Sequence, residues 1–151
     1  MKIIKPPNTI TRDHRTNKLI FLAGSIEKGK ADNWQSKVEK YFARLEDYVI
    51  LNPIREEWDS SWKEELDNPH FYKQVNWELD GLERADKIIM CLLPSSQSPI
   101  SLLELGLSAR SGKLLVCCEK GFWKKGNIDV VCERYKIPIY EDLDELLQMN
   151  F

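Results

Sequence analysis

The chain alternates between short continuous apolar runs and longer stretches in which apolar residues recur every three or four positions. The runs are bounded by Gly, Pro or polar residues, which predicts strands at 18–24, 48–51, 87–93, 113–118 and 136–140. The recurring pattern predicts helices from Asp32 to about Leu45, from Asn68 to about Ala85, from Ser98 to Gly112 and from Asp142 to Met149. Residues 121–135 are expected to be irregular or partly helical, and 55–67 to be a surface segment with one or two helical turns at most.

Strands that alternate with helices through short links predict a parallel sheet covered by helices. Five strands favour the α/β class, with a flavodoxin-like, doubly wound parallel sheet in three α/β/α layers. We expect a single domain over residues 1–151, in which residues 1–17 form a lead-in segment. Because ligands of such sheets bind beyond the carboxyl ends of the strands, the loops after Ala23, Leu51, Leu93 and Cys118 are the places for a site.

Composition and charge exclude several kinds of partner. The 22 Lys and Arg residues are balanced by 24 Asp and Glu residues, so there is no basic excess for a nucleic acid or a membrane surface. The longest apolar run, at 88–93, is far too short to span a bilayer, and the first residues lack the apolar core of a signal peptide. We therefore expect a small-molecule partner, no nucleic acid and no membrane.

Cysteine and histidine usage gives no sign of a metal site. The four cysteines contain no Cys-x-x-Cys pair, and neither histidine has a partner at metal-ligand spacing. We expect no metal, no cofactor, reduced and partly buried thiols, and a cytoplasmic location. Because side chains alternate along a strand, Cys117 and Cys118 are expected on opposite faces.

One carboxylate stands out by its surroundings. Glu104 is the one formally charged side chain between Ile88 and Ala109, and it lies with three serines on a narrow polar stripe of an apolar helix. Burial near the carboxyl edge of a sheet perturbs the pKa of such a group, which makes Glu104 a candidate catalytic residue. Two structural interpretations stay open: the stripe faces water, or Ser101 and Glu104 form a capping box.

A second carboxylate, Glu78, borders the face of its helix that Val75, Leu79 and Leu82 are expected to bury. Two carboxylates on separate helices near one sheet edge suit chemistry at an anomeric carbon, where one attacks and the other handles the proton of the leaving group. A solvated helix flank is the structural alternative for Glu78.

Several loop residues are candidates for substrate binding. Gly24, Ser25 and Ile26 follow the first predicted strand, where glycine allows close approach of the backbone to a ligand. Ser98 could hold a phosphate at a helix N-terminus or simply cap that helix. The loop that follows Leu51 contributes Asn52 and Trp58; Trp58 and Trp62 are packing residues or flank a planar base.

Several segments resemble the nucleoside 2-deoxyribosyltransferase family, most of all its deoxyribosyltransferase-like branch. They are FLAGSI at 21–26, NWELDGLERAD at 76–86, SPISLLELG at 98–106, GFWKKGN at 121–127 and VVCERY at 130–135. The resemblance runs from about residue 18 to 140. It implies a flavodoxin-like fold and cleavage of the N-glycosidic bond of nucleosides or nucleotides, usually by dimers or larger assemblies whose sites a neighbour completes.

The resemblance also implies roles for individual residues. Glu104, in the Glu-Leu-Gly motif, falls on the nucleophile that attacks C1′ and forms a glycosyl-enzyme ester, which a second base or water then resolves. Glu78 falls on an Asp that protonates or positions the leaving base. Gly24, Ser25 and Ile26 fall on pocket-lining residues.

Two departures from the family pattern bear on the reaction. Transferases proper have an Asp six residues before the nucleophile, where this chain has Ser98, and in nucleoside 5′-monophosphate hydrolases a Ser there helps to bind phosphate. Ser101 and Leu102 replace small glycines, which predicts a narrower pocket or another substrate.

Three interpretations of the function follow. The first is a 2′-deoxyribosyl transferase that works on a nucleoside and a free base through a covalent intermediate on Glu104. The second is an N-glycosidase that hydrolyses 2′-deoxynucleoside 5′-monophosphates. The third belongs to another class, a non-catalytic nucleotide-binding module. A homo-oligomer is expected for the enzyme.

Overall fold

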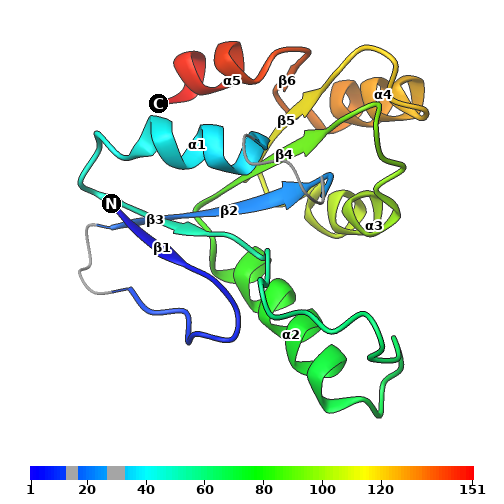
Figure 1. The fold of residues 1–151 in the computed structure, drawn as a ribbon. Helices are drawn as coiled ribbons and strands as arrows, with labels where there is room; N and C mark the ends of the chain where they lie inside the picture. The colour runs from blue at the N-terminus through cyan, green and yellow to red at the C-terminus, as the bar shows by residue number, and fades with distance from the viewer. Residues whose placement is uncertain (13–16, 27–32) are drawn as a thin grey trace.

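The computed structural model describes residues 1–12, 17–26 and 33–151, and it has the expected three-layer α/β/α architecture (Figure 1). Its parallel sheet has six strands in the order β1-β3-β2-β4-β5-β6. The strands are β1 (Lys2–Ile4), β2 (Lys18–Gly24), β3 (Tyr48–Leu51), β4 (Lys87–Leu92), β5 (Leu114–Cys118) and β6 (Ile139–Tyr140). The helices are α1 (Trp34–Phe42), α2 (Pro69–Arg84), α3 (Pro99–Ser108), α4 (Lys125–Tyr135) and α5 (Leu143–Asn150).

The sixth strand corrects the expected strand count, because part of the predicted lead-in segment belongs to the sheet. Residues Lys2, Ile3 and Ile4 of β1 pair with Val49, Ile50 and Leu51 of β3. β1 has only three residues and lies at the edge of the sheet, where two of its three side chains are exposed. A strand this short leaves no apolar run in the sequence, so the pattern could not reveal it.

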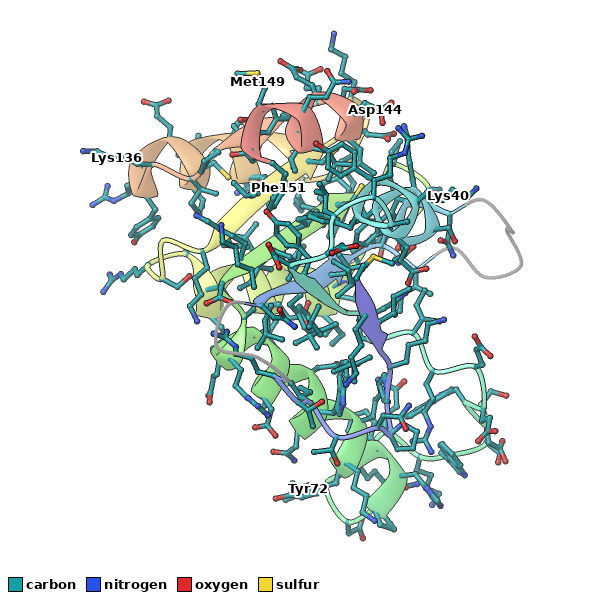
Figure 2. All side chains as sticks on the ribbon, turned by 90° about the vertical axis from the view of Figure 1, so that its left-hand side faces the viewer. Lys40, Tyr72, Lys136, Asp144, Met149 and Phe151 are labelled. Atoms are coloured by element: carbon teal, nitrogen blue, oxygen red, sulfur yellow. The ribbon has the colours of Figure 1, made fainter. Side chains whose placement is uncertain are left out.

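The helices divide between the two faces of the sheet. One core joins α2, α3 and α4 to residues such as Phe21 and Met90, and the other joins α1 and α5 to residues such as Leu22 and Ile89. Figure 2 shows α1 with Lys40 and α5 with Asp144 on one side of the sheet, and α2 with Tyr72 on the other. Cys118 belongs to the first core and Cys117 to the second, which confirms their opposite orientations.

The helix boundaries agree with the sequence pattern where a capping residue marks them. The Asn68 side chain accepts hydrogen bonds from the first turn of α2, and Asp142 accepts one at the start of α5. Asn33 caps α1, whereas the expected capping residue Asp32 lies outside the described residues. The C-termini of α1 and α3 come at Phe42 and Ser108, a few residues before the expected ends.

Two segments differ from their predicted regularity. Residues 125–135 form a continuous helix, α4, where irregular or partly helical structure is predicted. Its end is set by Lys136 in the left-handed conformation, from which its N–H bonds back to Cys132 and Glu133. Residues 55–67 contain turns and bends without a helix.

If β1 is set aside, the strand order is the flavodoxin-like 2-1-3-4-5, and the direction of winding reverses between β2 and β4. Gly24 ends β2 at this point with φ +132°, and a Cβ on it would lie 2.1 Å from the Cys91 carbonyl oxygen. Glycine is therefore required for the two strand ends to approach so closely. The carboxyl ends of β2 and β4 open the crevice in which ligands of this fold bind.

Candidate active site

A chain of hydroxyl groups joins the ends of β2 and β4. Ser25, which is fully buried, accepts a hydrogen bond from the Leu93 N–H at 2.9 Å, and its Oγ lies 2.7 Å from Ser98 Oγ. Ser98 Oγ in turn donates to Ser96 Oγ at 3.1 Å. These bonds fix the loop after β4 against the turn after β2, so both predicted substrate-binding serines lie at the switch point.

Ser98 does not act as a conventional helix cap. It occupies the N-cap position of α3, but it has φ +51° and its side chain makes no capping bond. A left-handed conformation is uncommon for serine and is held here by the bonds to Ser25 and Ser96. The capping interpretation of the Ser98 side chain is therefore wrong, and the first N–H groups of α3 have no side-chain acceptor from this residue.

The polar stripe of α3 faces inward. Ser101, Glu104 and Ser108 are buried, and Glu104 is 8% exposed, so the interpretation of a water-facing stripe is wrong. Ser101 is the third residue of the helix and Ser98 holds the N-cap position, so Ser101 and Glu104 do not form a capping box. Burial, with a smaller contribution from the charge of Glu78, raises the pKa of Glu104 to about 8.

Glu78 lies on the inward side of α2, half-buried. The buried residues of this helix are Gln74, Trp77, Gly81 and Leu82. Leu79, which was expected on the buried face, is exposed. A Cβ on Gly81 would lie 2.6 Å from the Phe21 ring, so glycine here lets α2 pack closely on β2. Burial raises the pKa of Glu78, and a hydrogen bond from Gln74 Nε2 to Glu78 Oε1 at 2.8 Å partly offsets the rise.

The fold thus brings together the two carboxylates that the sequence places 26 positions apart. They come from neighbouring helices on the same face of the sheet, and the charge of Glu78 acts on Glu104. Like charges at close range disfavour double ionisation, so the pair is expected to retain a proton at neutral pH. Retaining catalysis at an anomeric carbon requires two such groups, one carboxylate that attacks and one carboxylic acid that donates a proton.

The other predicted binding residues lie at the end of β2 and in the loop after β3. Gly24 is at the switch point, and Ile26, two residues on, is exposed. Asn52 is buried, where its Nδ2 donates to Glu39 at 2.8 Å and its Oδ1 accepts from the Ile54 N–H at 3.1 Å. These two bonds shape the start of the loop that follows β3.

Trp58 belongs to an aromatic cluster in the same loop. It meets Trp62 edge-on, with 5.0 Å between ring centroids, and Trp62 stacks on His70 at 4.1 Å and lies under the Arg55 guanidinium. The cluster anchors the acidic segment onto the first turn of α2. The predicted packing role of the two tryptophans is confirmed by these contacts, whereas contact of Trp58 with a base stays a prediction.

The sequence analysis did not identify two further residues: Gln74, which donates a hydrogen bond to Glu78, and Ser96, which accepts one from Ser98. Gln74 precedes Glu78 by one helical turn, and that spacing was a usable signal. Two surface hollows are lined by other residues, one by residues of α4 and β6 and one by residues at the start of α1 and along it. Within the parts of the chain that the structure describes, no group of three or more His, Cys, Asp or Glu side chains is placed to hold a metal ion.

The fold and site define a flavodoxin-like α/β protein with one buried and one half-buried carboxylate on helices that cover the same face of its sheet. A family model described as nucleoside 2-deoxyribosyltransferase like matches residues 17–122, which include β2 to β5 and both carboxylates, and the chain belongs to this family. No curated protein matches the chain. Membership supports an activity of the glycosyl-transfer or N-glycosidase kind on small nucleoside substrates. None of the helices in the described segments is long and apolar enough to cross a membrane.

Proposed function

We propose that the protein transfers the 2′-deoxyribosyl group of a nucleoside to a second base through a covalent intermediate on Glu104. The observation that carries this proposal is the pairing of buried Glu104 with half-buried Glu78 on helices that cover the same face of the sheet, where the charge of Glu78 acts on Glu104. Burial in a dry setting strengthens the interaction of both groups with developing charge at the sugar. Substrates of the family supply the glycosidic bond on which such a pair acts.

In the first half-reaction a Glu104 oxygen attacks C1′ as the C1′–N bond breaks. The leaving nitrogen takes the proton of Glu78, so the free base departs neutral. In the second half, a nitrogen of the incoming base attacks C1′, its proton returns to Glu78 and the ester to Glu104 breaks. Two inversions at C1′ give overall retention.

The protonation state of the pair constrains this mechanism. With a pKa of about 8, Glu104 carries the shared proton in the ligand-free protein at neutral pH. Attack requires the opposite arrangement, with Glu104 ionised and Glu78 protonated. One proton must therefore move between the carboxylates when substrate binds, and a bell-shaped pH profile that belongs to the pair is expected.

Substrate contacts are proposed for the residues around the pair. Gly24, Ser25 and Ile26 lie at the end of β2, and the buried Ser25 orders this turn through Leu93 and Ser98. Asn52 and Trp58 lie in the loop after β3, from which Pro53 contacts Gln74 beside Glu78. We assign the sugar to the first group and the base to the second, and no cofactor takes part.

A second candidate is hydrolysis of 2′-deoxynucleoside 5′-monophosphates, and one observation favours it. The Ser98 side chain does not cap α3, which leaves N–H groups at the positive end of the helix for an anion. Water would then replace the acceptor base. Product analysis of nucleosides and monophosphates, each with and without a free base, separates transfer from hydrolysis.

A homo-oligomer is proposed from the outer face of α3. Ile100, Leu103 and Leu107 recur at helical spacing and are each at least 60% exposed, and the one charged residue of the helix, Glu104, faces inward. Burial of such a row between two copies is favourable. Sedimentation of the wild type and of a Leu103→Glu variant tests this: the wild type should be larger than a monomer and the variant should shift toward monomer.

The cytoplasm is the proposed location, because the four cysteines are unpaired and buried, as expected of a reducing compartment. The third interpretation of the function, a non-catalytic nucleotide-binding module, makes a distinct prediction. It requires tight ligand binding without turnover, and Glu104→Gln should leave that binding unchanged. Turnover that Glu104→Gln abolishes excludes it.

A further inference from the structure

A buried amide links one carboxylate of the pair to the loop that follows β3. Gln74 lies one helical turn before Glu78 on α2 and is 9% exposed. Its Nε2 donates to the Pro53 carbonyl oxygen at 3.0 Å and to Glu78 Oε1 at 2.8 Å. The amide therefore links the Glu78 carboxylate to the backbone of the loop that follows β3.

The orientation of this amide is chemically determined. Gln74 Oε1 is buried and makes no hydrogen bond with the described part of the chain. Rotation of the amide by 180° would bring Oε1 against the Pro53 carbonyl and the Glu78 carboxylate, where three acceptors would meet. Both donated bonds favour the observed orientation, although it leaves a buried carbonyl unpaired.

A donor in this position favours the charged form of Glu78. A hydrogen bond to a carboxylate stabilises the ionised state, and Gln74 accordingly holds down a pKa that burial raises. Pro53 contributes a neutral carbonyl from the loop, and the charge of Glu78 in turn raises the pKa of Glu104 on α3. While Gln74 holds Glu78 ionised, the shared proton stays on Glu104.

We propose that Gln74 is a positioning residue that determines which carboxylate of the pair carries the shared proton. In the ligand-free protein it keeps Glu78 ionised and Glu104 protonated. The nucleophile is then a neutral carboxylic acid, which does not attack. A leaving base that engages Glu78 competes with Gln74 for that carboxylate, and the proton then moves from a Glu104 oxygen to a Glu78 oxygen. Ionisation of the nucleophile is thereby coupled to substrate binding. This inference rests on the proposed function.

Direct titration of the carboxyl groups tests the proposal without turnover. In protein with carbon-13-labelled glutamate carboxyls, the Glu78 and Glu104 signals are assigned with Glu78→Gln and Glu104→Gln variants. Gln74→Met keeps the length of the side chain and removes the donor. The pKa of Glu78 should then rise by about one unit, since hydrogen bonds to charged groups are among the stronger ones. Gln74→Glu, which replaces the donor with a like charge, should raise it as well.

Asn76→Met is the matched control on the same helix, because the Asn76 amide donates to the Tyr72 carbonyl at an exposed position. This variant should leave the pKa of Glu78 unchanged. With active enzyme, Gln74→Met should also move the pH profile of kcat/KM upward, because the carboxylate pair then holds its proton to higher pH. A Glu78 pKa that is unchanged in both folded Gln74 variants overturns the proposal. Absence of turnover in the wild type counts against the proposed function alone.

Discussion

The charge of Glu78 on α2 raises the pKa of Glu104 on α3, so the two helices present a coupled pair of carboxylates and not two independent acids. Burial is the larger cause of the shift at Glu104, and burial also raises the pKa of Glu78. The charge of Glu78 therefore contributes to the protonation state of Glu104. Changes at either residue should therefore alter both reactivity and pH dependence.

Replacement of the proposed nucleophile should abolish turnover. Glu104→Ala removes the group that forms the ester with C1′, and activity is expected to fall by several orders of magnitude while the fold is retained. Initial rates with nucleosides and a free base measure the loss. Glu83→Ala, which removes an exposed carboxylate of α2, is the control and should keep wild-type activity. Near wild-type turnover by the Glu104→Ala protein would refute the mechanism.

Replacement of the proposed acid should depend on the leaving base. Glu78→Gln removes the proton that the departing nitrogen needs, a contribution of about 10²–10⁴-fold for general acid catalysis. Nucleosides with activated bases need less protonation, so they should be slowed much less than those with poor leaving bases. Rates for a series of bases of graded basicity decide this. Equal slowing across the series would assign Glu78 to structure and not to proton transfer.

The raised pKa of Glu104 also predicts how stability varies with pH. Folding raises the pKa of Glu104 from its ordinary value of 4.5 to about 8, so the folded protein binds this proton more tightly than the unfolded chain does. The stabilisation is complete below pH 4.5 and is lost as pH rises through 8, at up to about 1.4 kcal/mol per pH unit for one proton.

The melting temperature should therefore fall by several degrees between pH 5 and pH 8.5. Glu104→Gln removes the titrating group and should flatten this fall, so the variant should melt above the wild type at pH 8.5. Thermal melts at a series of pH values measure both curves, with Glu83→Gln as the control that should follow the wild type. Parallel curves for wild type and Glu104→Gln would mean that Glu104 titrates normally.

Sequence patterns identified the parts of this fold that depend on local chemistry. Continuous apolar runs located the central strands, and Asn68 and Asp142 marked helix starts because their side chains satisfy the first N–H groups. The apolar pattern did not predict β1, because this edge strand of three residues buries only Ile4. Recognition of the pair depended on family resemblance as much as on physics.

The inward orientation of Glu104 could not be derived from its helix alone. α3 is apolar on almost every side, so periodicity does not say which side faces the sheet, and Leu103 and Leu107 are in fact exposed. Tertiary packing decides that question, as it decides the contact between Gln74 and Glu78. The left-handed conformation of Ser98 was hidden for a similar reason, because it depends on Ser25 in the turn after β2.

The last prediction concerns the anion that the start of α3 could bind. If the uncapped N–H groups hold a 5′-phosphate, a nucleoside monophosphate should bind more tightly than its nucleoside. Ser98→Asp places a negative charge beside those groups, so it should weaken binding of the monophosphate by repulsion and affect binding of the nucleoside less.

Titration calorimetry with a matched nucleoside and monophosphate, on wild type and variant, measures all four affinities. Thermal melts verify that the variant is folded, because Ser98 also bonds to Ser25 and Ser96. Equal affinity of the wild type for the two ligands would remove the phosphate site and with it the case for monophosphate hydrolysis.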